Sequence, residues 1–367
     1  MLFLIGFLSD KGGAERFALG LATHLPRDRF DVWFCCTRGA REGPVRTLEQ
    51  HGIPWVDLGR RNRWDVHRLW GLVRLLKRER FDVLHAHMFG SNLWGTLIGR
   101  ACRVPVLIAH EQTWAYRGNR LRAWLDGRVI GRLATRFVSV SPADAQRMIS
   151  YEGVPSERIV VIPNAYIPRV SATPTDLRRE LGISSTTPLI VTAAVFRPQK
   201  ALDVLLEAHA LVLADIPEAH LAIAGDGELR RELERKAADL GLGDKVHFLG
   251  VRQDVDAILQ AADVAALSSD FEGTPLFMFE CMANRTPLIS TAVGGLSSVI
   301  DSGRSGLLVP PRDPRALAGG ITALLNDPDR RQAMAQEALS QLGPFTIEAV
   351  TGRFAELYQD LVGSAQQ

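Results

Sequence analysis

The stretch SSDFEGTPLFMFECMANRTPLIS, residues 268–290, places Glu272 just before an apolar run and Glu280 inside it. Carboxylates are seldom buried without a partner, so two in this setting need an explanation. The preceding VAALSS predicts a buried strand. The apolar run predicts a helix with Thr274 as its N-cap and Pro275 as its first residue. Glu272 is therefore expected in the loop after a strand, and Glu280 more than one turn into the next helix.

The start of such a helix, at the carboxyl edge of parallel strands, favours anions and above all phosphates. Glu272 can reach ligand hydroxyls beyond a phosphate, and Glu280 suits a ribose diol. A sugar, a diphosphate and a ribose in one ligand would satisfy both. The alternative is a loop glutamate plus a core glutamate paired with an arginine, and the spacing alone slightly favours that alternative. The further residues expected to bind the ligand here are Gly273, Thr274, Pro275 and Leu276.

Short apolar runs alternate with amphipathic stretches along all 367 residues, which predicts parallel sheets covered on both faces. Residues 165–188 break the pattern with three prolines and several Ser and Thr, so we place a domain link there. We expect an α/β protein with two Rossmann-like domains, 1–168 and 169–345, whose parallel sheets face a central crevice. A last helix over 346–367 is expected to cross back to the first domain. The expected strands are LFLIGFL, DVWFCC, DVLHAH, VPVLIAH, RFVSVS, IVVIPN, PLIVTAAV, AHLAIAGD, KVHFLG, VAALSS, PLISTAV and GLLVP.

Composition indicates a soluble globular protein, with 46% hydrophobic and 23% charged residues. No apolar run approaches the roughly 18 residues that span a bilayer, and the four cysteines show no metal-ligand spacing. The net charge of +2 hides an asymmetry. Residues 1–168 hold 25 basic and 15 acidic side chains, and residues 169–367 hold the remaining 18 and 26. The two halves are therefore expected to meet different partners.

Other strand-to-helix loops carry further candidates for the same ligand. Arg197 and Lys200 precede a helix and can neutralise a diphosphate leaving group, although ordinary surface charge is the alternative. Gly225 lies in a tight turn. Gly12 and Gly13 follow the first strand, where phosphates or sugars approach a helix start.

Three histidines lie at the ends of expected strands in the first half. His110 can bond a sugar hydroxyl or assist proton movement, with a purely structural role equally favoured. We expect His85 and His87 on opposite faces of their strand, and on that ground we predict no metal site.

Together these motifs resemble the glycosyltransferases of the large retaining family 4 type, which have two facing Rossmann-like domains, the GT-B fold. The carriers of the resemblance include GGAER, DVLHAHMFGSN, VIPNAYIP, RPQKALDVLLEA and FEGTPLFMFECMA. The resemblance implies an acceptor-binding first domain and a nucleotide-sugar-binding second domain. It implies that Glu272 contacts the donor sugar, Glu280 the ribose, and Arg197 and Lys200 the diphosphate. Gly12, Gly13 and His110 would line the donor sugar and the acceptor.

The chain departs from the family pattern at several positions. Ala194 and Val195 replace a common Gly-Arg pair, Asn164 is followed by Ala165 rather than glycine, and Arg285 replaces a glycine. Arg197 is shifted toward Lys200 relative to the arginine of the family pattern.

The expected activity is transfer of a hexose from a nucleotide diphosphate sugar, with UDP favoured, to an acceptor hydroxyl with retention of configuration. Such an enzyme would act in the synthesis of cell-envelope glycan, glycolipid or polysaccharide. No cofactor or metal is expected, because protein cations and backbone N–H groups stabilise the leaving phosphate. The alternatives are a sugar-nucleotide epimerase, or a phosphorylase, on the same fold, and a non-catalytic nucleotide-sugar-binding module.

The acceptor is expected to be a carbohydrate or a lipid-linked sugar. Residues 60–81 and 114–136 mix arginines with Trp64, Trp70 and other aromatic residues, a combination that lies on anionic membranes. Solvated outer helices are the alternative reading. No nucleic-acid motif accompanies the basic half. The expected location is the cytoplasm, either free or peripheral on the inner face of the membrane.

Overall fold

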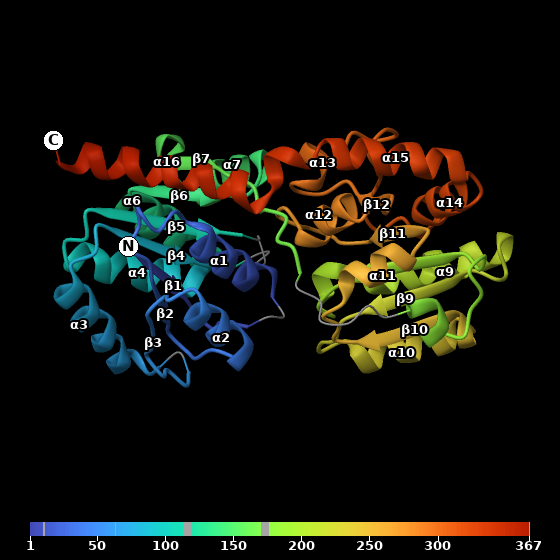
Figure 1. Ribbon diagram of the computed structural model, residues 1–367, viewed down its shortest axis with the longest axis horizontal. Helices are drawn as coiled ribbons and strands as arrows, with labels where there is room; N and C mark the ends of the chain where they lie inside the picture. The colour runs from blue at the N-terminus through green and yellow to red at the C-terminus, as the bar shows by residue number, and fades with distance from the viewer. Residues whose placement is uncertain (10–11, 63, 113–118, 170–175, 367) are drawn as a thin grey trace. The chain divides into compact units, whose positions relative to one another are not determined.

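The computed structural model describes residues 1–9, 12–62, 64–112, 119–169 and 176–366 (Figure 1). The chain forms two compact units, Met1–Ala165 with Phe345–Gln367, and Tyr166–Pro344. These limits fall close to the domain ends expected at 168 and 345. Within the expected link, residues 170–175 lie outside the described part of the chain.

The first unit is built on a parallel sheet of seven described strands in the order β3-β2-β1-β4-β5-β6-β7 (Figure 1). Every strand expected from the sequence is present, and one further strand, β3, was missed. Its three residues are only partly buried or exposed and lie at the sheet edge, so they lack the long apolar run of the others. The strands are β1 (Leu2–Ile5), β2 (Trp33–Cys36), β3 (Trp55–Asp57), β4 (Val83–His87), β5 (Val106–Glu111), β6 (Arg136–Ser139) and β7 (Ile159–Val161).

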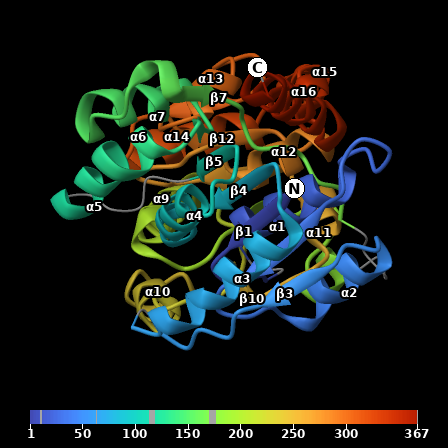
Figure 2. The same cartoon turned by 90° about the vertical axis from the view of Figure 1, so that its left-hand side faces the viewer.

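Helices cover both faces of this sheet because side chains alternate along each strand. In β1, Leu2 and Leu4 pack in the cluster on the side of α3 and α4, which lie side by side (Figure 2). Phe3 points the other way, toward rings that include His85 and His87. The helices of this unit are α1 (Gly13–His24), α2 (Glu42–Gln50), α3 (Trp70–Glu79), α4 (Phe89–Ala101), α5 (Arg120–Leu125), α6 (Gly131–Leu133), α7 (Pro142–Arg147) and α16 (Ile347–Gln366), with the shorter turns η1 (Val66–Leu69), η2 (Asp126–Ile130), η3 (Met148–Glu152) and η4 (Ser156–Arg158).

The last helix, α16, belongs to the first unit although it follows the second in sequence. Its buried residues recur every three or four positions, which is the pattern of a helix with one apolar face. That face packs on α1 and β5 and includes Phe354 and Tyr358.

The second unit has a parallel sheet of six described strands in the order β10-β9-β8-β11-β12-β13. The strands are β8 (Leu189–Ala193), β9 (His220–Ala224), β10 (Val246–Gly250), β11 (Val264–Leu267), β12 (Leu288–Thr291) and β13 (Leu307–Val309). The helices and turns are α8 (Leu177–Glu180), η5 (Pro198–Lys200), α9 (Leu202–Asp215), α10 (Arg230–Asp239), η6 (Gly243–Lys245), α11 (Val255–Ala261), α12 (Leu276–Ala283), α13 (Leu296–Val299), α14 (Pro314–Leu325), α15 (Pro328–Ser340) and η7 (Gly343–Phe345).

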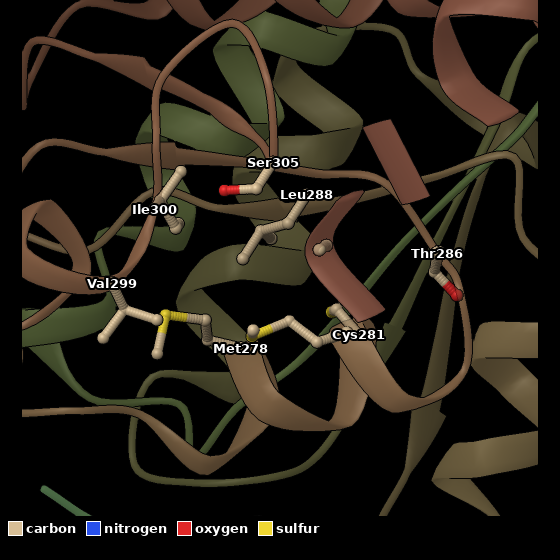
Figure 3. Close-up of a pocket in the computed structure, with 9 residues that line it drawn as sticks. Met278, Cys281, Thr286, Leu288, Val299, Ile300 and Ser305 are labelled. Atoms are coloured by element: carbon tan, nitrogen blue, oxygen red, sulfur yellow. The ribbon is translucent and has the colours of Figure 1, made fainter. Parts of the chain in front are cut away.

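The inner face of α12 is closely packed. Leu288 of β12 faces Met278 and Cys281 of α12 (Figure 3). Its neighbour Ile289 meets α14 on the opposite face of the sheet. The void left between α12 and its neighbours is about 10 Å³, about the size of one water molecule. The packed face of α12 therefore leaves room for nothing larger than a water molecule.

Candidate active site

The amino-terminal end of α12 has no side-chain cap. The helix starts at Leu276, and its N-cap is Pro275 in an extended conformation, so the prediction of Thr274 as N-cap is wrong by one residue. Thr274 is buried instead. Proline has no side-chain acceptor, so the first backbone N–H groups of α12 are not capped by a side chain. This leaves the helix end suited to an anion.

Glu272 lies in the loop between β11 and α12, as expected, and it is buried. Its Oε1 accepts a hydrogen bond from Lys200 Nζ at 2.5 Å and one from Ser269 Oγ at 2.6 Å. The lysine charge offsets the cost of burying the carboxylate. Lys200 comes from the loop after β8, which pairs with β11, so two adjacent strand ends bring the pair together.

Backbone contacts hold these two loops together. The Ser268 hydroxyl donates to the carbonyl oxygen of Lys200 at 2.9 Å, and the Asp270 N–H donates to Gln199 at 2.8 Å. Gly294, after β12, has φ +52°, and a Cβ there would lie 1.7 Å from the carbonyl oxygen of Glu272. Only glycine allows that loop to come so close. The geometry of Glu272 is therefore fixed from two sides.

Glu280 is buried in α12 and accepts a hydrogen bond from Arg169 Nε at 2.9 Å. The structure therefore places it beside an arginine, as the structural alternative expected. Its contact with a ribose remains a prediction.

Arg197 and Gly225 lie in neighbouring loops. Arg197 is exposed, and its side chain has no hydrogen bond or ion pair within the described residues. Gly225 has φ +131°, and a Cβ there would lie 1.8 Å from the carbonyl oxygen of Ala194. The tight turn expected at Gly225 therefore packs on the loop that carries Arg197. This leaves the Arg197 guanidinium available to an anion.

In the first unit, Gly12 is the N-cap of α1 and Gly13 is its first residue. The side chain of Glu15 lies over Gly12, where a Cβ would come within 1.8 Å of its carboxylate. The glycines thus stand at a helix start, as expected. Residues 10 and 11, which precede them, lie outside the described part.

The histidines of the first unit form one buried cluster, and the reason given for excluding a metal is wrong. Residues two apart on a strand share a face, and the rings of His85 and His87 lie 4.2 Å apart between centroids. His110 of β5 joins them, and nitrogens of the three rings lie within 4.8 Å of one another. Burial lowers the pKa of His87 to about 3 and holds the pKa values of His85 and His110 well below their usual range.

Hydrogen bonds join His85 to Tyr358 and to His110. His85 Nδ1 lies 2.7 Å from the hydroxyl oxygen of Tyr358, and His85 Nε2 lies 3.2 Å from His110 Nδ1. The Tyr358 hydroxyl is buried and pairs with His85 Nδ1, and which atom donates depends on the tautomer of His85. In the tautomer in which Tyr358 donates, His85 donates from Nε2 to His110 Nδ1.

The Nδ1 atom of His87 accepts a hydrogen bond from the side-chain amide of Gln112 at 3.2 Å. Each ring offers one nitrogen within 4.8 Å of the other two, so the geometry of the three histidines alone could accommodate a metal ion. His110 is fully buried, and its Nε2 has no partner within the described residues. Sequence reasoning missed Tyr358, because its helical spacing shows burial but not its partner.

Two family descriptions match the chain. "Glycosyltransferase Family 4" matches residues 11–168, and "Glycosyl transferases group 1" matches residues 174–341. The D-inositol 3-phosphate glycosyltransferase of Thermobispora bispora is 31% identical and covers 96% of this chain and 90% of its own length. An Escherichia coli UDP-Gal:alpha-D-GlcNAc-diphosphoundecaprenol alpha-1,3-galactosyltransferase is 24% identical, covering 95% of this chain and 94% of its own.

Among solved structures, Anabaena Alr3699/HepE in complex with UDP-glucose has a TM-score of 0.85 at 22% identity, over 98% of this chain and 100% of its own. The two sheets and these matches define a two-domain nucleotide-sugar-type transferase fold, GT-B. The chain belongs to the family 4 glycosyltransferases and is a glycosyltransferase. The resemblance seen in the sequence is confirmed. Among the described residues, no helix combines the length and apolar character needed to cross a bilayer.

The buried histidines predict a loss of stability in mild acid. Their folded pKa values lie below the ordinary value of 6.5, so the unfolded chain binds more protons below that pH. The free energy of unfolding should therefore fall as pH falls from 6.5 toward 5, by up to about 1.4 kcal/mol per pH unit for each ring. Urea denaturation at a series of pH values measures this slope. His87→Gln should reduce it, whereas the exposed-site variant His51→Gln should not; equal slopes in all three proteins would contradict the assignment.

Proposed function

We propose that this glycosyltransferase moves a hexose from a nucleotide diphosphate sugar, with UDP favoured, to an acceptor hydroxyl with retention of configuration. The observation that carries the proposal is the buried Lys200–Glu272 pair beside the uncapped start of α12. Both features sit at the carboxyl edge of a parallel sheet, where such ligands bind. HepE is bound to UDP-glucose in the structure compared above, and the name of the E. coli relative includes a UDP-sugar donor. These favour UDP.

In this proposal, the diphosphate lies at the start of α12. Lys200 has three N–H donors, so it can hold a phosphate oxygen while it keeps Glu272. Arg197, which is exposed, adds a second cation. The first N–H groups of α12 complete a set of donors for the charge that develops on the leaving phosphate. Glu272 accepts hydrogen bonds from the donor sugar. Gly12 and Gly13 line the approach to the donor sugar. The ring of His110 is buried, so His110 positions neighbouring groups from within the core.

Retention follows from attack on the same face as the leaving group. The acceptor oxygen forms a bond to the anomeric carbon as the bond from that carbon to the phosphate oxygen breaks. The departing phosphate oxygen takes the acceptor proton. Positioning and electrostatic stabilisation supply the rate enhancement. No metal is required in this proposal, because Lys200, Arg197 and the helix start stabilise the phosphate charge.

The donor class can be read from thermal stabilisation, since a ligand that binds only the folded state raises its stability. UDP or its sugar conjugates should raise the melting temperature more than GDP, ADP or NAD. Glu280→Ala should weaken that shift, because the proposed ribose contact is lost. Glu234→Ala, a partly exposed glutamate in the same unit, serves as control. No response to any nucleoside diphosphate, or an unchanged shift in Glu280→Ala, would contradict the donor assignment.

Lys200→Ala should lower kcat about 100-fold or more, because one preorganised cation at the leaving phosphate is lost. The control is Lys236→Ala, which removes a lysine from another glutamate ion pair of this unit. Transfer from UDP-sugar to a panel of acceptors would be followed with and without EDTA, and the anomer formed would be identified by NMR. Full activity in Lys200→Ala would contradict the role of Lys200 at the leaving phosphate. Loss of activity in EDTA would contradict a reaction that needs no metal, and an inverted product would contradict retention.

For the acceptor, we propose a lipid-linked or membrane-proximal carbohydrate of the cell envelope, reached by a protein that associates peripherally with an anionic inner leaflet. The observation in favour is the exposure of Trp64, Trp70 and Trp124, at 74%, 66% and 55%, in the basic first unit. Large aromatic side chains are rarely left in water without a partner surface. The names of the two relatives include acceptors that carry phosphate. Trp114 and Tyr116, which contributed to the expectation, lie outside the described residues.

Co-sedimentation with vesicles tests this surface. The protein should pellet with anionic vesicles at low salt and be released at high salt, as expected for charge-driven binding. The double variant Trp70→Ala/Trp124→Ala should bind more weakly, whereas Leu240→Ala, an exposed apolar residue of the second unit, should not. Absence of binding to anionic vesicles at low salt would remove the membrane proposal.

A further inference from the structure

A basic hollow of about 520 Å³ opens in the first unit, apart from the residues assigned above. Its lining is Phe7, Arg38, Gly59, Arg60 and Arg61. These residues follow β1, β2 and β3, three neighbouring parallel strands, so the hollow lies at the carboxyl edge of the sheet. Pockets for small ligands typically have this position and a volume of this order.

The walls of the hollow are built on regular backbone. The Arg38 N–H donates to the carbonyl oxygen of Gly6 at 2.7 Å, and the Arg60 N–H donates to Thr37 at 2.9 Å. These bonds continue the pairing of the strands past their ends. The arginines therefore start from fixed positions, which lowers the cost of ordering them around a ligand.

Positive charge is concentrated here. Arg60 is only 8% exposed, and burial together with the charge of Arg38 lowers its pKa. Nη1 of Arg68 lies 2.9 Å from where a Cβ on Gly59 would be. Within the described residues, Arg38, Arg61 and Arg68 form no ion pair with a carboxylate. Two carboxylates stand nearby: Asp65 accepts the backbone N–H of Arg61 at 2.8 Å, and Asp57 accepts that of Gly59 at 2.8 Å.

Guanidinium groups gathered around a hollow repel one another unless an anion lies between them. A phosphate suits the arrangement, because its charge approaches two and arginine binds it through two parallel hydrogen bonds. Phe7, which is partly exposed, adds an apolar wall beside the charged one.

We propose that this hollow binds the phosphate group of a phosphorylated acceptor, as a phosphate ester or a diphosphate. The proposal rests on the transferase function above and names the acceptor class for it. The same chemistry could come from the donor's diphosphate, and the experiment separates the two sources.

The test is binding of inorganic pyrophosphate to the full chain already saturated with UDP, measured by calorimetry at physiological salt. UDP occupies the donor site, so pyrophosphate reports on a second site. We expect binding that weakens about tenfold or more in the double variant Arg38→Gln/Arg61→Gln, because two charge-assisted contacts are lost. Both side chains are exposed, so folding should be retained. The control, Arg132→Gln on α6, removes an exposed arginine away from these strands and should bind normally.

Each other outcome has a definite meaning. Equal pyrophosphate affinity in the double variant and the control would overturn the proposal, as would no binding to the UDP-saturated protein. Loss of UDP affinity in the double variant would assign the hollow to the donor instead and also overturn it. Failure of the proposed function would look different. In that case UDP itself would not bind, or Lys200→Ala would leave UDP affinity unchanged, while pyrophosphate binding would still depend on Arg38 and Arg61.

Discussion

The order of strands in the two sheets is the constraint on which the sites depend. In the second unit the order turns back between β8 and β11, so the helices that follow them, α9 and α12, leave toward opposite faces. The space between the two strand ends is therefore free of a covering helix. Lys200 and Glu272 lie in the loops that flank this point, and their ion pair joins the two loops. The first unit repeats the arrangement between β1 and β4, where Gly12 comes after β1 and His87 is the last residue of β4.

Much of this could be predicted from one sequence, because burial leaves local patterns. Parallel strands covered on both faces read as unbroken apolar runs, and all of the expected runs became strands. The loop position of Glu272 followed from the strand before it and the helix after it. The errors were local. β3 is too short and too exposed to give such a run, and the N-cap shifted from Thr274 to Pro275 within the usual uncertainty of helix ends. The two-residue period of a strand, applied correctly, would have placed His85 and His87 on one face.

Partners distant in sequence could not be predicted. Arg169 meets Glu280 across 111 positions, and Tyr358 meets His85 across 273. Helical spacing shows that Tyr358 is buried, and an apolar neighbourhood shows that Glu280 needs a partner. Neither shows which residue supplies the hydrogen bond. In the proposed donor complex, a ribose diol would share the Glu280 carboxylate with Arg169 or displace it.

The first unit separates two kinds of hydrogen-bond donor along one sheet edge. At the ends of β4 and β5, burial keeps the histidines neutral, and the hydrogen bond from Gln112 to His87 Nδ1 leaves an Nε2–H donor on His87 within the core. At the ends of β1, β2 and β3 the donors are charged guanidiniums. A neutral donor orients a hydroxyl without attracting phosphate from the solvent, whereas a guanidinium binds phosphate strongly. In the proposed function, the phosphate of an acceptor would lie at the arginines, while the buried histidines support the neighbouring strand ends from within the core. The excess of positive charge in the first half then supports recognition of an anionic acceptor as well as attraction to an anionic membrane surface.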